Sequence, residues 1–478
     1  MVSSASGQGK ERMSKETSGG NPFTSGMADF IAGLSHESIP AEVIERIKLL
    51  ILDSLGCAIF GAQMEWSRIL METLASVDSS SGSRIWGTAR RLSAPHAVLV
   101  NGTLVQSFEL DDVHRQGVLH VGAVTLPPLF AVAEMKPGMS GRDFLTAAVA
   151  GYEIGPRVGM CMGQEHIVQG WHSGATVGVF SAAAGAAKGL ALPAGKIVHA
   201  LGIAGTQAAG LMAAQFGAMV KRMHAGRSAQ SGFYAALLAA NDFTGIADVF
   251  ENPYGGFCTT FSRSTDRFNR DELTAGLGTR FETMRISLKF YSCVSTNHTA
   301  LDALRTMQAR HPFGPKDVAK IVVRCSQATR EHAGWPYKPE GMTAAQLNLS
   351  YCLATLLLEG DCFVDQFSEN LLADPHRLAL AAKVEVHEDP SITALGSKFR
   401  HKVHVGVHLN GCTVLEETVE APRGSEQNFP SVGDVLAKFT KLTAQRMAPG
   451  KAQRIADMVL GLDTLASMDG LVMALAYA

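Results

Sequence analysis

The sequence contains no paired cysteine motif. Its eight cysteines are scattered along 478 residues, without a Cys-x-x-Cys pair or a repeated spacing. Zinc sites and disulfide frameworks usually show such spacings, and scattered thiols are typical of reducing compartments. We therefore predict no disulfide framework and no zinc site, and we expect a cytoplasmic protein.

A strong net charge and a long apolar run are also missing. The 42 basic and 44 acidic residues leave a formal net charge of -2, whereas proteins that bind nucleic acid or anionic membranes are usually basic. The longest weakly polar run, residues 173–187, is too short to cross a bilayer. We predict no nucleic-acid partner and no membrane association, so any attraction for an anionic ligand must be local.

Several familiar catalytic motifs do not occur. The chain has no Gly-x-Gly-x-x-Gly turn, Walker loop, Gly-x-Ser-x-Gly elbow or His-Glu-x-x-His motif, which argues against the common dinucleotide, nucleotide, hydrolase and metalloprotease sites. His114 and His120 lack the partner set of a metal site. The simplest prediction is an enzyme that uses no cofactor and no metal.

The first 26 residues are rich in Ser, Gly and Lys and contain no apolar core segment. A secretory signal or a membrane anchor needs such a segment, and this composition is typical of a disordered tail. We therefore expect residues 1–26 to form a disordered tail.

Apolar residues at helical spacing dominate the first half of the chain. Residues 40–61 give the clearest amphipathic pattern, with apolar side chains three to four positions apart after Pro40. Similar patterns cover residues 93–108, 122–134, 141–160, 174–190, 193–214 and 224–241. This half is therefore predicted to be nearly all helix.

The pattern changes after about residue 285, where strand and helix signals mix. The signals are strands at 321–323, 402–409 and 412–419, and helices at 296–310 and 344–358. Asn410-Gly411 predicts a hairpin turn, and His404 and His408 alternate with valines, so we place both histidines on a solvated strand face. From residue 430 onward the pattern is helical again, which indicates an α+β unit between two helical segments.

A cluster of charged residues separates two apolar stretches, residues 94–108 and 126–133. Its titratable side chains are Glu109, Asp111, Asp112, His114 and His120. Burying such groups is costly unless they are paired or used, so this acidic triplet and its two histidines form a candidate site. An alternative is that Asp111 and Asp112 only close one helix and cap the next.

Two further groups of cationic or polar residues lie in apolar surroundings. The first follows Gly217 and consists of Lys221, Arg222 and His224, a set that suits a multiply charged carboxylate better than a solvated turn. The second is Lys289, in an apolar stretch at the predicted domain junction, where ligand sites concentrate. His172 follows a tryptophan at the start of a predicted helix and is expected to bind either helix-start amides or a ligand carboxylate.

Several of these motifs resemble a known family. Glu109-Leu-Asp-Asp-x-His, followed by Leu-His120-x-Gly-Ala, resembles the signature of the MmgE/PrpD family, whose members include 2-methylcitrate dehydratases, cis-aconitate decarboxylases and an iminodisuccinate epimerase. The likeness continues at residues 170–175, 206–212, 217–222, 289–293 with His298, and 459–463. The Leu-His pair, the Ala-Gln-Phe-Gly stretch and the Val-Leu-Gly-Leu-Asp stretch most resemble fungal cis-aconitate decarboxylases.

The resemblance implies a mainly α fold with an α+β insert. The expected all-helical domain is built from both termini, residues 27–285 and 428–478, and residues 286–427 form a smaller α+β lid domain. The resemblance also implies a homodimer. The chain departs from the family pattern at Val113, where many relatives have Thr, at Val121, and at Val294, where vertebrate decarboxylases have an additional histidine.

The resemblance further implies a cofactor-free lyase that acts on a small polycarboxylate. Our preferred hypothesis is a decarboxylase of cis-aconitate or an alkylated relative; the alternatives are a 2-methylcitrate-type hydro-lyase and an epimerase. We expect His120 to donate a proton, Lys221 and Lys289 to stabilise developing charge, and Glu109 and Asp112 to orient these groups. The expected substrate-binding residues are His172, Arg222, His224 and His298.

Overall fold

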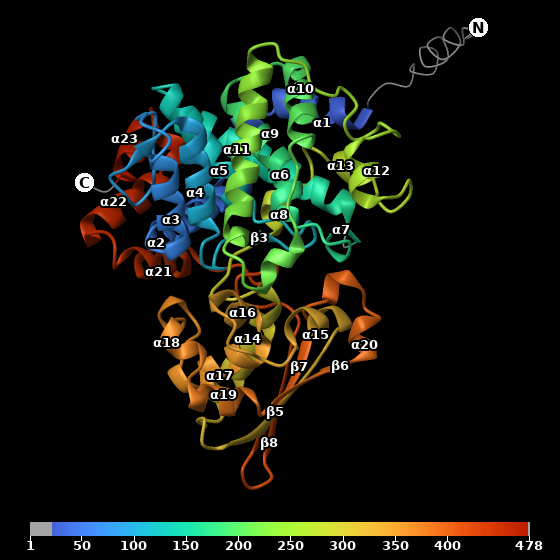
Figure 1. Ribbon diagram of the computed structural model, residues 1–478, viewed down its shortest axis with the longest axis vertical. Helices are drawn as coiled ribbons and strands as arrows, with labels where there is room; N and C mark the ends of the chain where they lie inside the picture. Colours follow the sequence, from blue (N-terminus) through green and yellow to red (C-terminus); the bar gives the residue numbers. More distant parts are fainter. Residues whose placement is uncertain (1–21, 164, 477–478) are drawn as a thin grey trace, which may run out of the picture.

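The computed structural model describes residues 22–163 and 165–476. The fold is mainly α-helical with a small α+β part (Figure 1), which confirms the predicted fold class. In Figure 1 the α+β part, which we call the lid, lies below the helical part, and the carboxyl-terminal helices lie against α2. None of the described helices is long and apolar enough to span a lipid bilayer.

Apolar residues at helical spacing, together with capping side chains, explain the helices of the helical part. Its longer helices are α1 (Pro22–Gly33), α2 (Ala41–Gly61), α3 (Glu65–Ala75), α4 (Ala94–Val105), α5 (Val121–Met135), α6 (Gly141–Met162), α9 (Gly178–Gly189), α10 (Ala194–Gly205), α11 (Val220–Ala240), α21 (Val432–Thr443) and α22 (Pro449–Leu460). Shorter ones are α7 (Glu165–Val168), α8 (Ser173–Thr176), α12 (Phe257–Ser262), α13 (Asp271–Thr274) and α23 (Asp469–Ala474). Ser140 and Ser431 cap α6 and α21 by accepting hydrogen bonds from the amides of Asp143 and Asp434.

The lid contains a four-stranded sheet in the order β6-β5-β7-β8. Its strands are β5 (Val318–Cys325), β6 (Val384–Glu388), β7 (Val403–Leu409) and β8 (Val414–Val419). Only β5 and β6 are parallel. The predicted hairpin at Asn410-Gly411 joins β7 to β8, and His404 and His408 are only half-buried beside the fully buried valines of β7.

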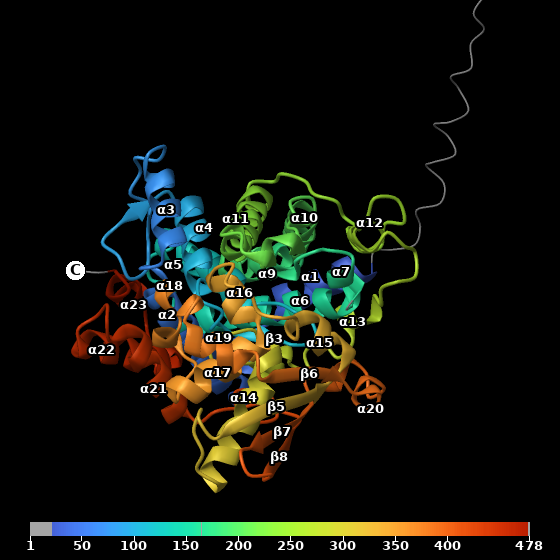
Figure 2. The same ribbon diagram turned by 60° about the horizontal axis from the view of Figure 1, so that its bottom comes forward.

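Seven helices of the described lid accompany this sheet: α14 (Ser295–Arg310), α15 (Gln327–Ala333), α16 (Met342–Leu347), α17 (Leu349–Glu359), α18 (Glu369–Leu372), α19 (Pro375–Ala381) and α20 (Pro390–Thr393). Figure 1 places α14 and α16 at the seam with the helical part, and Figure 2 shows β8 at the edge of the sheet beside β7. The lid core also includes Phe60, Phe108 and Leu110 from the helical part. The seam is therefore packed with apolar side chains.

The structure corrects two details of the predicted organisation. Residues 22–26, which we assigned to the tail, belong to α1, because Glu251 accepts hydrogen bonds from the amides of Phe23 and Thr24 at 2.7 and 2.6 Å. That contact joins distant parts of the chain, so local composition does not reveal it. The rest of the predicted tail, residues 1–21, lies outside the described residues.

The helical part is also not purely helical. It holds the hairpin β1 (Ser83–Arg84) with β2 (Arg91–Leu92), and the strand β3 (Val113–His114), which pairs with β4 (Ile286–Ser287). Strands of two residues show no alternation in a sequence. The β3–β4 pair brings the acidic stretch beside the segment that leads into the lid. The domain limits at 286 and 427 stay a prediction.

Candidate active site

Glu109 lies at the centre of a buried group of cations. Its carboxylate contacts the Lys221 ammonium, accepts a hydrogen bond from Arg222 Nη1 at 2.7 Å, and lies 3.4 Å from Lys289 Nζ. Glu109 has a φ of 54°, in the left-handed region that non-glycine residues rarely adopt. The structure thus brings Glu109 and Asp111 of the acidic triplet together with Lys221, Arg222 and Lys289.

Each cation is positioned by a different element. Lys221 and Arg222 lie in the first turn of α11, while Lys289 follows β4 and the β3–β4 pair. Arg222 Nη2 also donates to Gln346 Oε1 of α16 at 2.8 Å, and Gln346 Nε2 donates to the Phe108 carbonyl oxygen at 3.1 Å. The lid is therefore hydrogen-bonded to the cation cluster across the seam.

The electrostatics of the cluster keep the Glu109 carboxylate ionised. Burial alone would raise its pKa, but Lys221, Lys289 and Arg222 outweigh burial and hold the pKa well below its usual range. Burial lowers the pKa of Lys289, but Glu109 and Asp111 outweigh it and raise that pKa. For Lys221, burial outweighs the attraction of Glu109 and the pKa is lowered. Lys289 is therefore the more firmly charged lysine.

His120 and Asp111 form a second pair next to this cluster. Nδ1 of His120 donates to Asp111 Oδ2 at 2.9 Å, and Asp111 Oδ1 lies 3.6 Å from Lys289 Nζ. Burial raises the pKa of Asp111, but His120 and Lys289 outweigh it and lower the pKa. Because Asp111 fixes the proton on Nδ1, Nε2 of His120 is the ring nitrogen left for a ligand.

Asp112 makes its contacts away from the cations. Its carboxylate accepts from the Gly122 amide in the first turn of α5 and from the Tyr152 hydroxyl of α6, both at 2.8 Å. Burial raises the pKa of Asp112 to about 7. The helix-capping alternative therefore accounts for Asp112 but not for Asp111, which contacts His120 and Lys289.

The remaining predicted histidines are uncharged. His172 and His224 share a contact of 3.2 Å between their Nδ1 atoms, and burial lowers the pKa of both. His298 Nε2 donates to the Cys293 carbonyl oxygen at 3.2 Å, while burial and Lys289 lower its pKa to about 3. Nδ1 of His298 is then an acceptor, and the expectation that His298 binds the substrate stays a prediction.

His114 takes part in a structural network. Nε2 of His114 donates to Glu282 Oε2 at 3.1 Å, and its Nδ1 accepts from the Gly117 amide at 2.9 Å. Both ring nitrogens are therefore occupied within the protein.

Comparison with known families decides the classification. Residues 25–269 match the MmgE/PrpD N-terminal domain, and residues 291–464 match the MmgE/PrpD C-terminal domain. The chain belongs to the MmgE/PrpD family. Its relatives include a cis-aconitate decarboxylase of Aspergillus terreus, 32% identical over 96% of this chain and 97% of the relative.

Two more relatives extend this comparison. A cis-aconitate decarboxylase-like protein of Aspergillus oryzae is 34% identical over 94% of this chain and 96% of its own length. The human cis-aconitate decarboxylase is 28% identical over 77% of each chain. Within the MmgE/PrpD family, the fungal resemblance read from the motifs is thus confirmed.

Sequence reasoning missed three polar residues of this MmgE/PrpD site. Gln346 and Thr343 of α16 both accept hydrogen bonds from Arg222 Nη2. Lys438 of α21 donates to the Leu110 carbonyl oxygen at 2.8 Å and pairs with the buried Asp53 at 2.6 Å. The sequence offered one signal for these three residues, which is that Gln346 is a polar side chain in the apolar helical stretch at 344–358.

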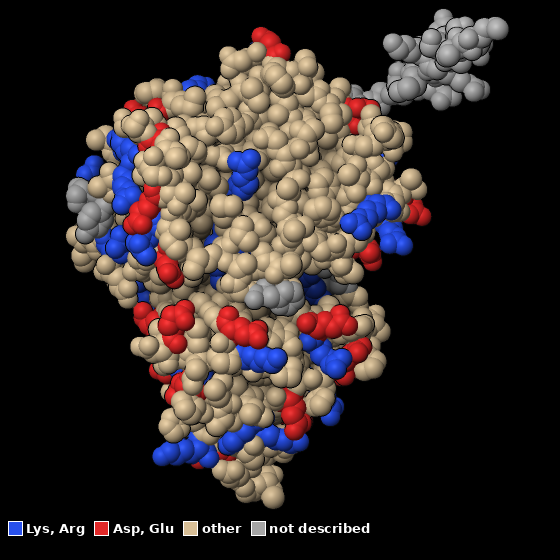
Figure 3. Space-filling view, in the orientation of Figure 1, with Lys and Arg blue, Asp and Glu red and all other residues tan. Residues whose placement is uncertain are grey.

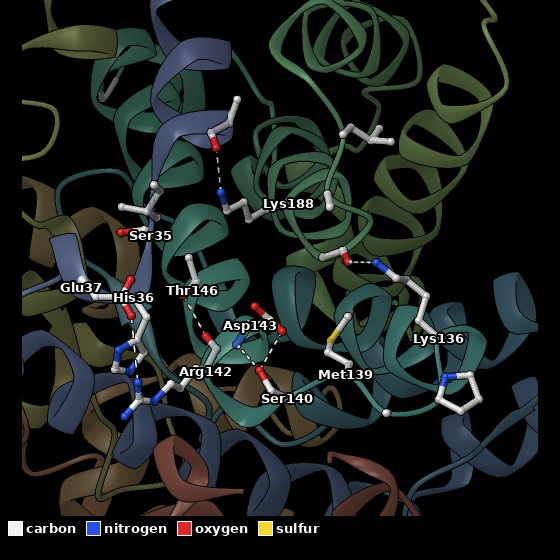
Figure 4. Close-up of a pocket in the computed structure, with 17 residues that line it drawn as sticks. Ser35, His36, Glu37, Lys136, Met139, Ser140, Arg142, Asp143, Thr146 and Lys188 are labelled. Carbon is white, nitrogen blue, oxygen red and sulfur yellow. Dashed lines mark hydrogen bonds and ion pairs between the residues drawn. The ribbon is translucent and has the colours of Figure 1, made fainter. Parts of the chain in front are cut away.

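The largest of the cavities that we describe lies elsewhere in this MmgE/PrpD chain. It has a volume of about 690 Å³. Residues near the ends of α1, α6 and α9 line it, among them Ala32 and Leu192 (Figure 4). None of the predicted site residues lines it, and its Lys136 and Lys188 donate to backbone carbonyl groups. A second cavity of about 440 Å³ lies against α16 and is lined by residues that include Gln215, His332, Trp335, Ala344 and Leu347.

Proposed function

We propose that this protein is a cofactor-free carboxy-lyase of the cis-aconitate decarboxylase type. The observation that carries the proposal is the buried cluster of Lys221, Arg222 and Lys289 around Glu109, with the His120–Asp111 pair beside it. The fungal and human relatives named as cis-aconitate decarboxylases support this reaction. The substrate is cis-aconitate or an alkylated relative.

The reaction requires charge stabilisation and one proton. Loss of carbon dioxide breaks the bond to the CH2 carbon of cis-aconitate, and its electron pair moves through the double bond toward a second carboxylate. The resulting dienolate carries additional charge on oxygen. Preorganised cations in a site closed to water stabilise such charge strongly. A proton donated to the carbon beside that carboxylate completes the product.

The cluster provides both functions. Lys221, Arg222 and Lys289 hold the retained carboxylates, and Glu109 fixes the three cations relative to one another. His120 delivers the proton from Nε2 while Asp111 holds its ring. We assign Asp112 a positioning function at the start of α5, whereas the sequence led us to expect that it orients His120 or the lysines. His172, His224 and His298 contribute uncharged hydrogen-bonding groups.

The closed arrangement also requires a motion. Lys221 and Lys289 are only 6% and 2% exposed, so a substrate reaches them when α16 moves away from the helical part. Breaking the Arg222–Gln346 contact is the necessary first step. When the Arg222–Gln346 contact forms again, the lid shields the cluster from water during the reaction.

The alternative reaction is dehydration of a 2-methylcitrate-type acid, which the family membership supports. It removes a proton beside a carboxylate and needs an acid to expel hydroxide. Val113 stands where many relatives have Thr, so a hydroxyl that is expected in a site for a hydroxylated substrate is missing. This difference counts against a hydroxylated substrate and so against dehydration, but it does not separate decarboxylation from epimerisation of a dicarboxylate.

The full-length protein, incubated with cis-aconitate, tests the proposal directly. We expect itaconate to accumulate, and chromatography measures it. A dehydratase instead raises the ultraviolet absorbance of a 2-methylcitrate solution, and an epimerase removes the optical rotation of a chiral diacid. Either outcome without itaconate contradicts the decarboxylase assignment.

Assembly and location belong to the same proposal. Val220, Tyr234 and Leu238 of α11 are exposed apolar side chains, although the exposed Arg227 lies between them, and Figure 3 shows few charged side chains over α10 and α11. Such a face supports the proposed homodimer. We place the dimer in the cytoplasm, in keeping with the scattered thiols.

A further inference from the structure

Three buried thiols converge behind the loop that carries Lys289. The Sγ atoms of Cys293, Cys352 and Cys362 all lie within 4.8 Å of one another, and the three side chains are fully buried. Cys293 precedes α14, Cys352 lies on α17, and Cys362 follows α17. These positions are far apart in the sequence, which is why cysteine spacing gave no sign of the cluster.

Backbone and side-chain hydrogen bonds hold the segments around the three thiols. The Ser292 amide donates to the Cys362 carbonyl oxygen at 3.0 Å, and the Val294 amide donates to the Gln346 carbonyl oxygen at 3.0 Å. Asn297 Nδ2 donates to Cys352 Sγ at 3.5 Å. The convergence of the sulfur atoms is therefore built into the junction between the helical part and the lid.

Two oxygen atoms in the same segment are buried without a partner. Among the described residues, neither Ser292 Oγ nor Asn297 Oδ1 has a hydrogen-bond partner. A buried polar atom without a partner is costly in a folded protein. The Asn297 amide already contacts Cys352 Sγ, so Asn297 Oδ1 is the candidate fourth ligand for a metal ion that three sulfur atoms surround.

A simpler interpretation is that cysteines serve here as small apolar residues. It explains the burial of each thiol, but not why three sulfur atoms converge beside the side chain of Asn297, whose amide oxygen lacks a partner. The other close thiol pair, Cys161 and Cys258, has an Sγ–Sγ distance of 3.8 Å but no third sulfur within reach in the described chain. This pair provides a matched control.

We propose that Cys293, Cys352 and Cys362 bind one zinc ion as a structural site. Thiolate sulfur is a preferred zinc ligand, and structural sites are four-coordinate. Sulfur atoms at about 2.3 Å from one zinc ion lie roughly 3.8 Å apart, so the thiols move inward by about 1 Å at most. The thiols release their protons as the ion binds, and no oxidation or reduction takes place.

The site would form as the chain folds, because the closed cluster offers no exposed thiol. A metal ion bound in this way stabilises the folded state. It would tie the loop after Lys289 to α17 and so fix the lysine in the cation cluster. This inference does not depend on which reaction the protein catalyses.

Metal analysis of the purified full-length protein tests the inference. We expect about one zinc ion per chain by mass spectrometry, and intense thiolate-to-cobalt absorption after replacement with Co²⁺. Cys352→Ser should lose the bound zinc and most of that absorption, whereas Cys258→Ser should keep both. A wild-type protein without zinc that also gives no thiolate-to-cobalt absorption overturns the proposal, as does a Cys352→Ser variant with an unchanged spectrum.

A second measurement covers the case in which Cys352→Ser does not fold. Wild-type protein is alkylated in mild denaturant, which opens the buried cluster, with and without a zinc chelator, and the modified cysteines are mapped by mass spectrometry. We expect the chelator to increase the alkylation of Cys293, Cys352 and Cys362 but not that of Cys161. Equal alkylation in both conditions, or a disulfide between two of the three cysteines, contradicts the proposal.

Discussion

Lys289 Nζ lies 3.4 Å from Glu109 Oε2, although the two residues are 180 positions apart in the sequence. The β3–β4 pair, which places Val113 opposite Ser287, makes this contact possible. Both charged residues lie within four positions of that pair. The central ion pair of the site therefore depends on two strands of only two residues each.

Replacing His120 tests the proton donor. We expect His120→Gln to lower kcat by roughly 10²- to 10⁴-fold, the usual contribution of a positioned acid, with a smaller change in KM. Steady-state rates of itaconate formation measure this effect. His404→Gln, on the half-buried face of β7, is the control, and equal losses in both variants would count against His120.

Replacing Glu109 tests its function as the fixed anion. Glu109→Gln leaves three buried cations without their shared carboxylate, so we expect the free energy of unfolding to fall by about 3–5 kcal/mol. Denaturant titration measures the change. Glu416→Gln on exposed β8 should have little effect. A Glu109→Gln variant as stable as wild type would show that the cluster is not electrostatically coupled.

Asp112 gives a pH-dependent prediction. Its pKa is about 7 in the folded protein and near 4 when unfolded, so its stabilising contribution is complete below pH 4 and is lost as the pH rises toward 7. Asp112→Asn removes this titration. We expect the variant to gain on wild type by up to about 1.4 kcal/mol per pH unit between pH 4 and 7.

Denaturant titrations at several pH values in that interval check this expectation. Asp242→Asn, at a position that is 83% exposed, is the control for general charge effects. A constant difference in unfolding free energy between Asp112→Asn and wild type across the interval would contradict the assignment.

Gln346 tests the contact between lid and cluster. Gln346→Ala leaves Arg222 Nη2 and the Phe108 carbonyl group without this partner, so we expect a loss of about 1–3 kcal/mol in stability and a higher KM. Thermal denaturation and kinetics measure the two effects. Gln327→Ala, an exposed glutamine of the same lid, should change neither.

The sequence predicted the helices well because their spacing is a local property. The pattern at 40–61 became α2 (Ala41–Gly61), and the alternation at 402–409 became β7. The predicted helix at 193–214 ends at Gly205, and that at 174–190 is divided at Val177. Where a helix ends or is interrupted depends on tertiary packing, and the periodicity of the sequence carries no information about that packing.

The site was predictable only in part, for a related reason. Charged residues in apolar stretches indicated Glu109, Lys221 and Lys289, and the structure brings these three together. The hydrogen bonds of Gln346, the neutral state of His298 and the convergence of three cysteines depend on contacts between distant segments. No local pattern of the sequence encodes them.

The central claim is that the buried cations around Glu109 form the catalytic centre, and Lys289→Ala tests it most directly. Rates of itaconate formation from cis-aconitate are compared for wild type, Lys289→Ala and Lys320→Ala, the last at an exposed position of the lid. We expect Lys289→Ala to lose on the order of 10²- to 10³-fold in kcat and Lys320→Ala to match wild type. Wild-type activity in a folded Lys289→Ala protein would contradict the account.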